Sequence, residues 1–204
     1  MLLHRYLEQV LGNKTVITLL RTMITYRGKI FTVRGLADEA NVSTNETALI
    51  VHNLEKMGII KIQPIGRAYH LELNEKSYLL SEIIEPAINA EKNTIDELIQ
   101  VLRKYFDTKK IITAAIFGSV ASAKEKIDSD IDLFIISNDH DHAITLVSEA
   151  SKQVSIRFNG ILSQIIFTEK EFKAKQKGSL VQSIIDNHIL ICGKKIVVND
   201  KRSR

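Results

Sequence analysis

The residues best suited to chemistry in this sequence lie in two short segments of its second half. Gly118 and Ser119 end the apolar run 111–117, and Asp130 and Asp132 open a second apolar run after a short spacer. Side chains alternate along a strand, so both carboxylates project from one face, close enough to share a divalent metal ion. A glycine lets the backbone approach a phosphate, and the serine adds a hydroxyl and an N–H donor. This combination is the apparatus of phosphoryl or nucleotidyl transfer.

The joint pattern resembles the signature of the polymerase-β-like nucleotidyltransferase superfamily, which reads apolar residue, Gly-Ser, spacer and Asp-x-Asp in a strand. The resemblance implies catalytic and metal-binding roles for Asp130 and Asp132 and a nucleotide-binding role for Gly118 and Ser119. It also implies Mg²⁺ as the cofactor and a nucleoside triphosphate as the ligand. The alternative is a strand–loop–strand segment whose acidic residues are incidental.

The resemblance breaks at a third carboxylate. Active members of the family carry this acid on the strand after the next helix, where the apolar run 160–168 places Ser163. A serine cannot hold a second metal ion or help to deprotonate an attacking hydroxyl as a carboxylate does. Gln164 is no substitute, because strand alternation puts it on the opposite face. The pattern is therefore compatible with nucleotide and one-metal binding, but it lacks a group that two-metal catalysis needs.

The first half of the chain predicts a winged helix-turn-helix. Its expected helices are one from Lys14 that stops before Gly28, one over 33–40 capped by Thr32, and one to about Met57 that begins with a Ser43–Glu46 capping box. These are followed by expected strands 59–63 and 68–73, which a tight connection at 64–67 joins. Segments 36–43 and 54–60 resemble bacterial and archaeal winged-helix transcription regulators, so DNA is the expected partner of this half.

If this half binds DNA, the helix that starts at Ser43 is expected to enter the major groove. Its outward residues would be Thr44, Asn45, Ala48 and His52, and Asn45 can pair bidentately with adenine. Arg67 at the wing tip suits a phosphate or minor-groove contact. The basic footprint is weak, because acidic residues nearly balance the basic ones. A winged helix used for protein–protein contact or dimerisation is therefore the alternative.

The predicted fold class is α+β: an N-terminal winged helix-turn-helix domain at 1–76, a helical connector at 77–93 and a small mixed α/β nucleotidyltransferase-like domain at 94–204. The connector is expected to hold a helix interrupted at Pro86, followed by a polar hinge at 89–93. A second capping box, Thr94–Glu97, is expected to open the next helix. The connector helix would either bridge the domains or pair two chains in a homodimer, and the sequence leaves both open.

Composition narrows the class of protein further. The chain has 204 residues, a net charge of +4 and a pI near 9.1, which mildly favours anionic partners. The single cysteine, Cys192, rules out an internal disulfide framework and is expected to be a buried, inert thiol. No apolar run is long enough to span a bilayer, so we expect a cytoplasmic protein without a membrane partner. The run 139–142 of alternating Asp and His is expected to cap a helix rather than to bind a metal.

Taken together, these features predict a DNA-binding transcriptional regulator whose second domain binds a nucleotide and a metal and is catalytically degenerate. The first alternative is an active nucleotidyltransferase that moves a nucleoside monophosphate onto a protein or a small molecule. The second is an antitoxin-like partner of a toxin protein, because related small nucleotidyltransferases pair with toxins. Ser163 favours the regulator over the active enzyme, whereas no sequence feature separates the antitoxin interpretation from the other two.

Overall fold

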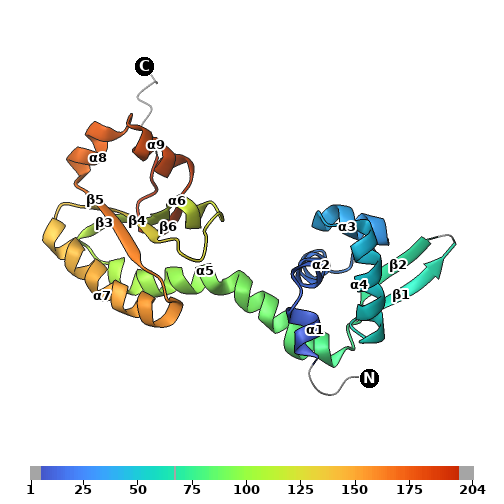
Figure 1. Cartoon of the computed structure of the whole chain (residues 1–204). Helices are drawn as coiled ribbons and strands as arrows, with labels where there is room; N and C mark the ends of the chain where they lie inside the picture. Colours follow the sequence, from blue (N-terminus) through green and yellow to red (C-terminus); the bar gives the residue numbers. More distant parts are fainter. Residues whose placement is uncertain (1–5, 67, 198–204) are drawn as a thin grey trace. The chain divides into compact units, whose positions relative to one another are not determined.

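The computed structural model describes residues 6–66 and 68–197 and divides the chain into two compact units, Met1–Asn93 and Thr94–Arg204 (Figure 1). The predicted α+β class is confirmed: helices with a wing-like β-hairpin make up the first unit, and a mixed sheet with helices makes up the second. Within the described residues, no helix is long and apolar enough to cross a membrane.

The first unit contains helices followed by an antiparallel hairpin. In chain order these are α1 (Leu7–Leu11), α2 (Lys14–Thr25), α3 (Val33–Ala40), α4 (Thr44–Lys56), β1 (Ile60–Ile65) and β2 (Ala68–Leu73). A further backbone bridge joins Phe31 to Leu71 and ties the start of α3 to the hairpin. The apolar faces of α2 and α4 pack on this hairpin and form one core, which includes the fully buried Leu19, Leu54 and Ile59. Apart from α1, which was not predicted from the sequence, the arrangement matches the predicted order of helices and strands.

The helix starts depend on different capping groups. The Asn13 side chain accepts hydrogen bonds from the N–H groups of Thr15 and Val16 at the start of α2, and the Thr32 hydroxyl accepts one from Gly35 at the start of α3. The expected capping box at the start of α4 is wrong, because the Ser43 side chain makes no capping hydrogen bond. That helix is held by its packing and by the backbone of its first turn.

The hairpin is tighter than expected. Strand β1 continues through Pro64 and Ile65, which pair with Tyr69 and Ala68, so the connection predicted at 64–67 is too long. Proline has no N–H to offer a ladder but is tolerated on an edge strand, where that N–H would face solvent. Gly66 follows with a φ of +61°, a conformation that favours glycine. Arg67 lies outside the described residues.

The expected interruption at Pro86 and the expected hinge at 89–93 are both wrong. A π-helical turn, η1 (Leu80–Ile84), leads directly into α5 (Glu85–Phe106), which runs across the boundary between the units. The Glu85 N–H donates to the Leu80 carbonyl, so the turn is already widened where Pro86 can donate no hydrogen bond. Thr94 therefore lies inside a helix, and the second capping box does not form.

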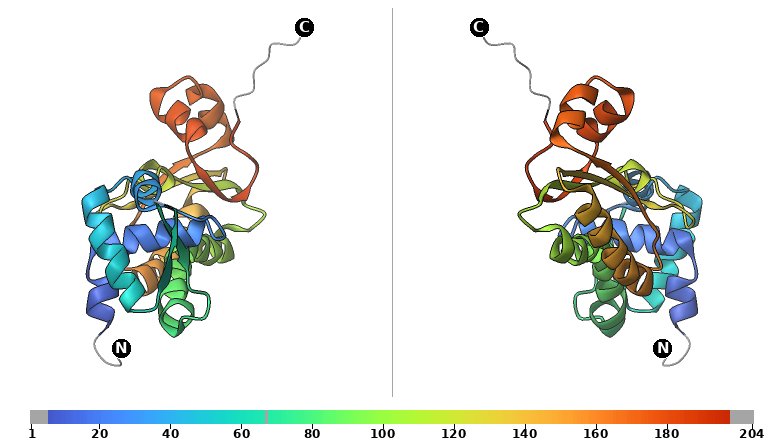
Figure 2. Two further views of the ribbon diagram at one scale, coloured as in Figure 1. Left: turned by 90° about the vertical axis from the view of Figure 1, so that its right-hand side faces the viewer. Right: turned by 90° about the vertical axis from the view of Figure 1, so that its left-hand side faces the viewer.

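The second unit is built on a four-stranded mixed sheet with strand order β5-β4-β3-β6. Its elements after α5 are β3 (Ile111–Phe117), α6 (Gly118–Ala121), β4 (Ile131–Ser137), α7 (His140–Phe158), β5 (Leu162–Phe167), α8 (Glu169–Lys175), α9 (Ser179–Asp186) and β6 (Ile189–Gly193). Strand β3 is antiparallel to both β4 and β6, whereas β4 and β5 are parallel. Helix α7 lies on one side of this sheet, and α8 and α9 lie on the other (Figure 2).

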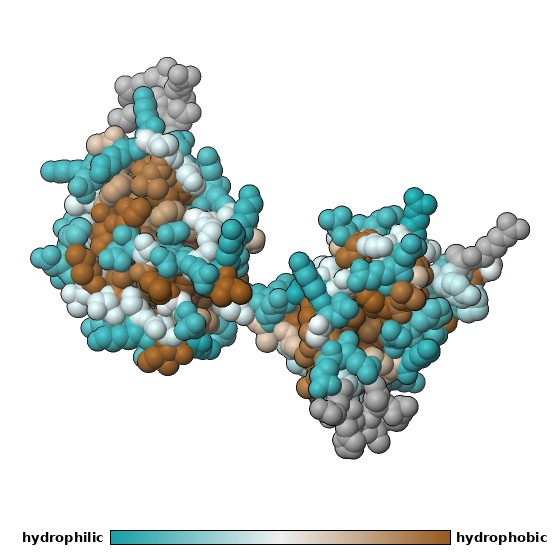
Figure 3. Space-filling view, in the orientation of Figure 1, coloured by the Kyte–Doolittle hydropathy of each residue, from teal (hydrophilic) through white to brown (hydrophobic). Residues whose placement is uncertain are grey.

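Each face of the sheet has its own apolar cluster. The larger cluster lies under α5 and α7 and includes Phe106, Leu133 and Ile135. The smaller one lies under α8 and α9 and includes Phe134 and Ile184. Several residues around the smaller cluster are only partly buried, and apolar surface is visible on this unit in the space-filling view (Figure 3). The smaller cluster shares its sheet face with Asp132, two residues before Phe134 on β4.

Candidate functional site

The Gly118 backbone lies directly against the Asp132 carboxylate. Phe117 pairs with Asp132 across β3 and β4, which brings the chain turn after β3 beside the first residues of β4. A Cβ atom on Gly118 would stand 2.2 Å from Asp132 Oδ2, and Gly118 has a φ of +73°. Both the space and the backbone conformation therefore require glycine here. The structure thus brings together Gly118 and Asp132, two of the predicted site residues.

The turn that holds Gly118 and Ser119 is closed by its own hydrogen bonds. The Ser122 hydroxyl donates to the Gly118 carbonyl at 2.8 Å and is also 3.1 Å from the Ser119 carbonyl. The Lys124 N–H donates to the Ser119 carbonyl at 2.9 Å. Ala123, which precedes Lys124, has a positive φ of 51°. These contacts fix the path of the backbone next to the carboxylates. A preset turn of this kind costs little further ordering when a ligand binds.

Asp130 and Asp132 are close enough to influence each other electrostatically. Asp132 is partly buried in β4, and Asp130 is exposed just before the strand begins. The pKa of Asp132 is raised, first by its partial burial and second by the negative charge of Asp130. Both causes disfavour a second negative charge at this point. A bound cation would relieve that repulsion.

Ser163 occupies the position beside Asp132 on the neighbouring strand. Strands β4 and β5 are parallel, and their register pairs Asp132 with Ser163 and Leu133 with Gln164. Ser163 therefore shares the face of Asp132, whereas Gln164 lies on the other face. Across the part of the chain that the structure describes, no group of three or more His, Cys, Asp and Glu side chains could hold a metal ion. At the position where a third carboxylate would stand beside Asp132, the chain has Ser163.

The donor set fits one hard divalent cation better than two. Carboxylate oxygens are the ligands that Mg²⁺ prefers, and it commonly binds through one or two of them together with substrate phosphates. Asp130 and Asp132 provide such a pair. Partial burial and then the charge of Asp130 raise the pKa of Asp132, and a cation bound there would stabilise its ionised form. A second ion would need further carboxylates, and Ser163 provides none.

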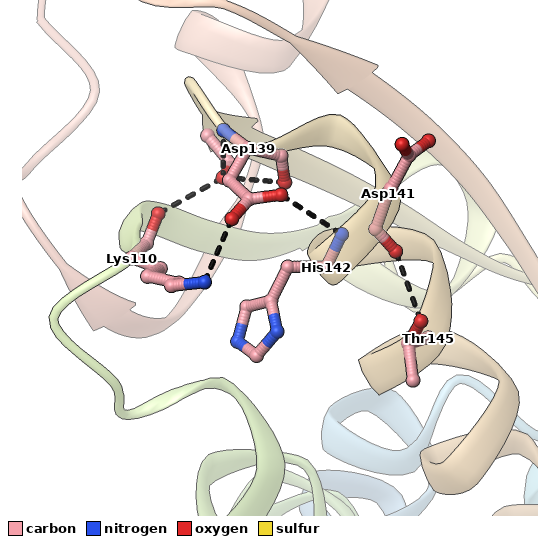
Figure 4. A network of polar contacts seen from close by, with 6 residues as sticks. Lys110, Asp139, Asp141, His142 and Thr145 are labelled. Carbon is pink, nitrogen blue, oxygen red and sulfur yellow. Dashed lines mark hydrogen bonds and ion pairs between the residues drawn. The ribbon is translucent and has the colours of Figure 1, made fainter.

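The Asp-His run at the start of α7 has a structural role. Asp139 caps this helix by accepting a hydrogen bond from the His142 N–H at 3.1 Å, and it pairs with Lys110 at 2.8 Å. The Lys110 ammonium and the His142 N–H lower the pKa of Asp139. Figure 4 shows that the Asp141 carboxylate points away from Asp139 and that the His142 ring lies on another side, so these groups do not converge on one point.

Helix α4 presents an exposed stripe that the fold does not use. Thr44, Asn45 and His52 are exposed, as expected, but Ala48 is half-buried. The stripe is completed instead by Leu49, whose exposed fraction is 72%. Sequence reasoning missed this leucine because an apolar residue is normally assigned to the core. The spacing 45, 49 and 52 would have revealed it.

Of the nine lysine and arginine side chains that the structure describes in the first unit, five are paired with acids of the same unit. Arg21 pairs with Glu91 at 2.7 Å, and further pairs join Arg27 to Glu85, Lys29 to Glu39, Arg34 to Asp38 and Lys61 to Glu72. These pairs explain in structural terms why the unit has a weak basic footprint. The predicted phosphate contact, Arg67, lies outside the described residues.

Comparison with known proteins identifies the class of the second unit. Residues 96–197 match the family model described as Polymerase beta, Nucleotidyltransferase. This match spans half of the chain, so the protein belongs to the polymerase beta nucleotidyltransferase family. The matched range contains the Gly118 turn, both aspartates and Ser163.

Solved structures with some likeness to this chain are remote. A toxin-antitoxin with AMP-PNP matches at 16% identity, covering 49% of this chain and 73% of that chain, with a TM-score of 0.34. A mutant of the toxin-antitoxin MntA-HpeT matches at 14% identity with the same coverage and a TM-score of 0.33. TrmBL2, an archaeal chromatin protein with a novel mode of DNA binding, matches at 16% identity, covering 89% of this chain and 72% of that chain, with a TM-score of 0.30. A search of curated proteins found no match.

Proposed function

We propose that this protein is a DNA-binding regulator whose second unit binds a nucleoside triphosphate with Mg²⁺ and transfers nucleotides poorly or not at all. The observation that carries the proposal is the pairing of Asp132 with Ser163 in the β4–β5 register. The chain keeps the aspartate pair and the closely packed glycine turn of its family, but it has a serine where a third acid would stand.

The nucleotide site would use the Gly118–Ser119 turn and the two aspartates. The turn presents backbone N–H groups and the Ser119 hydroxyl to a phosphate group, since Gly118 carries no side chain that would block the approach. Asp130 and Asp132 would hold Mg²⁺, which when bound offsets the charge of the triphosphate. In this proposal the residues bind and orient the nucleotide, and no residue of β5 accepts a proton from an acceptor hydroxyl.

The transfer step is tested with α-labelled nucleoside triphosphates, using the protein itself and a cell extract as acceptors. We expect no measurable transfer by the parent and some gain in Ser163→Asp, because the absence of a general base typically costs about 10²–10⁴ in rate. Nucleotide binding by the parent should persist with Mg²⁺ and fall at least about tenfold in Asp130→Asn. Binding that is equal in the parent and the variant would place the nucleotide elsewhere.

The rival function is an active transferase, which membership of a nucleotidyltransferase family favours. The same assay separates the two. Strong transfer by the parent that disappears in Asp130→Asn would establish the enzyme and overturn the degenerate interpretation.

The regulator half of the proposal is supported by the exposed stripe on α4. Asn45 can pair with an adenine, and Leu49 can contact a thymine methyl group, the two kinds of contact by which helices read the major groove. We expect Asn45→Ala to relax sequence choice at one base pair and Arg67→Ala to weaken binding to all sequences, with a salt slope shallower by about one phosphate contact.

Fluorescence anisotropy with the protein's own promoter region and with random duplexes measures both effects. Asn89→Ala, a change at an exposed asparagine in α5, is the control and should leave DNA binding unchanged. Absence of DNA binding by the parent at low salt would remove the regulator interpretation.

A further inference from the structure

A cavity of about 1010 Å³ lies within the first unit, at the C-terminal end of α4. It is bounded by Tyr6 just before α1, by the last residues of α4 around Met57, and by the segment 76–79 that follows the hairpin. Ligand pockets in proteins typically measure about 300–1,000 Å³. The cavity is therefore large enough for a drug-sized molecule.

One wall of this cavity is apolar and aromatic. Met57 and Leu79 are half-buried, and both pack against the core of the unit. Tyr6 is half-buried, and Tyr78 has an exposed fraction of 69%. A flat apolar body can lie against these side chains, because tyrosine offers both a ring face and a hydroxyl.

Two ammonium groups stand at the same cavity. Lys56 and Lys76 both line it, and within the described residues neither ammonium has an ion-pair partner. They differ in this respect from Arg21, Arg27, Lys29, Arg34 and Lys61 of the same unit, which are paired with acids. One acid, Glu55, also lines the cavity, and it lies 3.9 Å from His52. The lysines therefore exceed the acids among the lining groups.

Ser77 adds a polar group to the same cavity. It lines the cavity with an exposed fraction of 8%, and its N–H donates to the Asn74 carbonyl at 2.8 Å, which fixes the residue at the cavity wall. Its hydroxyl is a donor that an anionic group in the cavity can use.

We propose that this cavity binds an amphipathic anion, a molecule with a flat apolar ring and one carboxylate or similar acidic group. The ring would lie against Tyr78, Met57 and Leu79, and the anionic group would reach Lys56 and Lys76 with Ser77 as a further donor. The site is separate from the Asp130–Asp132 site in the second unit, so it does not depend on nucleotide binding.

The test uses 2-naphthoate and its neutral analogue 2-naphthamide, followed by ¹H–¹⁵N NMR on the full-length protein. We expect 2-naphthoate to shift the signals of the lining residues and to bind about tenfold more tightly than the amide, because a hydrogen bond to a charged group typically contributes that much. In the double variant Lys56→Gln, Lys76→Gln this preference should disappear. Lys92→Gln, at an exposed lysine outside the cavity, should keep it.

Ser77→Ala should weaken 2-naphthoate binding while the spectrum stays folded, since the change removes only a donor at the cavity wall. Equal binding of the acid and the amide would overturn the anion specificity. Shifts confined to other residues, or no shifts, would overturn the site. Binding that appears only after residues 1–5 are deleted would show that the chain itself fills the cavity, which would also overturn the proposal.

Discussion

At the level of individual residues, the site depends on a contact that tolerates only glycine. Gly118 lies against Asp132 Oδ2, and a methyl group there would stand 2.2 Å from that oxygen in a backbone conformation that side chains rarely adopt. Gly28 has a similar positive φ of +86°, but a Cβ atom added there would meet no other atom within 4 Å. The two glycines therefore separate the cost of backbone conformation from the cost of the contact.

Gly28→Ala should cost about 1–2 kcal/mol, the usual cost of placing a side chain in the left-handed region. Gly118→Ala should cost more than this and should also abolish Mg²⁺-dependent nucleotide binding, because Asp132 must move. Urea unfolding and calorimetric nucleotide titration measure the two effects. Equal costs in both variants, with nucleotide binding intact, would show that the contact has no role.

The raised pKa of Asp132 predicts a pH-dependent cost of folding. Burial and Asp130 raise this pKa in the folded state, so the carboxylate destabilises the fold once it is ionised. The cost is absent below the ordinary aspartate pKa and fully present above the raised one. Asp132→Asn should therefore be more stable than the parent at neutral pH without Mg²⁺, and the difference should vanish in acid.

Thermal unfolding of the parent and of Asp132→Asn is measured with and without Mg²⁺. The ion should stabilise the parent but not Asp132→Asn. Asp96→Asn, at an exposed position in α5, serves as the control and should retain the Mg²⁺ effect. A parent that is more stable than Asp132→Asn at neutral pH without Mg²⁺ would contradict the expected sign.

Cys192 should be inert in the folded protein. Burial, helped by Asp107, raises the pKa of this thiol to about 11, which leaves it almost wholly protonated at pH 8. When a thiol reagent such as dithionitrobenzoate is added to the folded protein at pH 8, we expect no reaction and no colour. After urea is added, one equivalent of thiol should react. Rapid reaction without urea would mean that β6 opens readily.

Among the helices and strands, the sequence predicted which elements form more reliably than how they begin and end. Apolar spacing located α2, α3, α4 and the hairpin, because burial of one face dominates their stability. The capping pattern failed at Ser43 and at Thr94 but is realised at Thr168 and Glu171. At Thr94 the pattern lies inside α5, and four residues cannot distinguish a helix start from a helix interior. At Ser43 the helix does begin, but the side chain makes no capping hydrogen bond.

The same limit applies to Pro86 and to the site. A proline favours a break, but the π-helical turn before it is set by the packing of Leu80 and Ile84 in the core. The sequence indicated that Gly118, Asp130 and Asp132 belong together. The family resemblance also indicated Ser163 as the residue at the third-acid position, and the β4–β5 register sets it beside Asp132. Without the resemblance, the sequence could not supply this register, since it depends on long-range pairing.

Adjacent helices offer a matched test of capping. Thr32→Ala removes a hydroxyl that accepts the Gly35 N–H at 3.0 Å and should cost about 1 kcal/mol. Ser43→Ala, at the same position of α4, removes no capping bond and should change the free energy of unfolding by about 0.5 kcal/mol or less. Urea unfolding followed by circular dichroism measures both. A larger loss for Ser43→Ala would mean that its side chain caps α4 in solution.

For the chain in its entirety, the main feature is that its two units have separate apolar cores. One core lies wholly within Met1–Asn93, and the two clusters of the sheet lie within Thr94–Arg204. Helix α5 is the element that runs from one unit into the other. Each unit can therefore lose its core packing while the other keeps its own, unless α5 couples them.

Two core substitutions test this independence. Leu54 is 2% exposed in the first unit and Leu133 is fully buried in the second, so replacing either by alanine should cost about 2–5 kcal/mol locally. NMR spectra recorded against temperature should show Leu54→Ala lowering the transition of the first unit alone and Leu133→Ala that of the second alone. Mg²⁺ with a nucleoside triphosphate should raise only the second transition. If either substitution lowers both transitions together, α5 transmits stability between the units, and nucleotide binding in one would then reach the other through that helix.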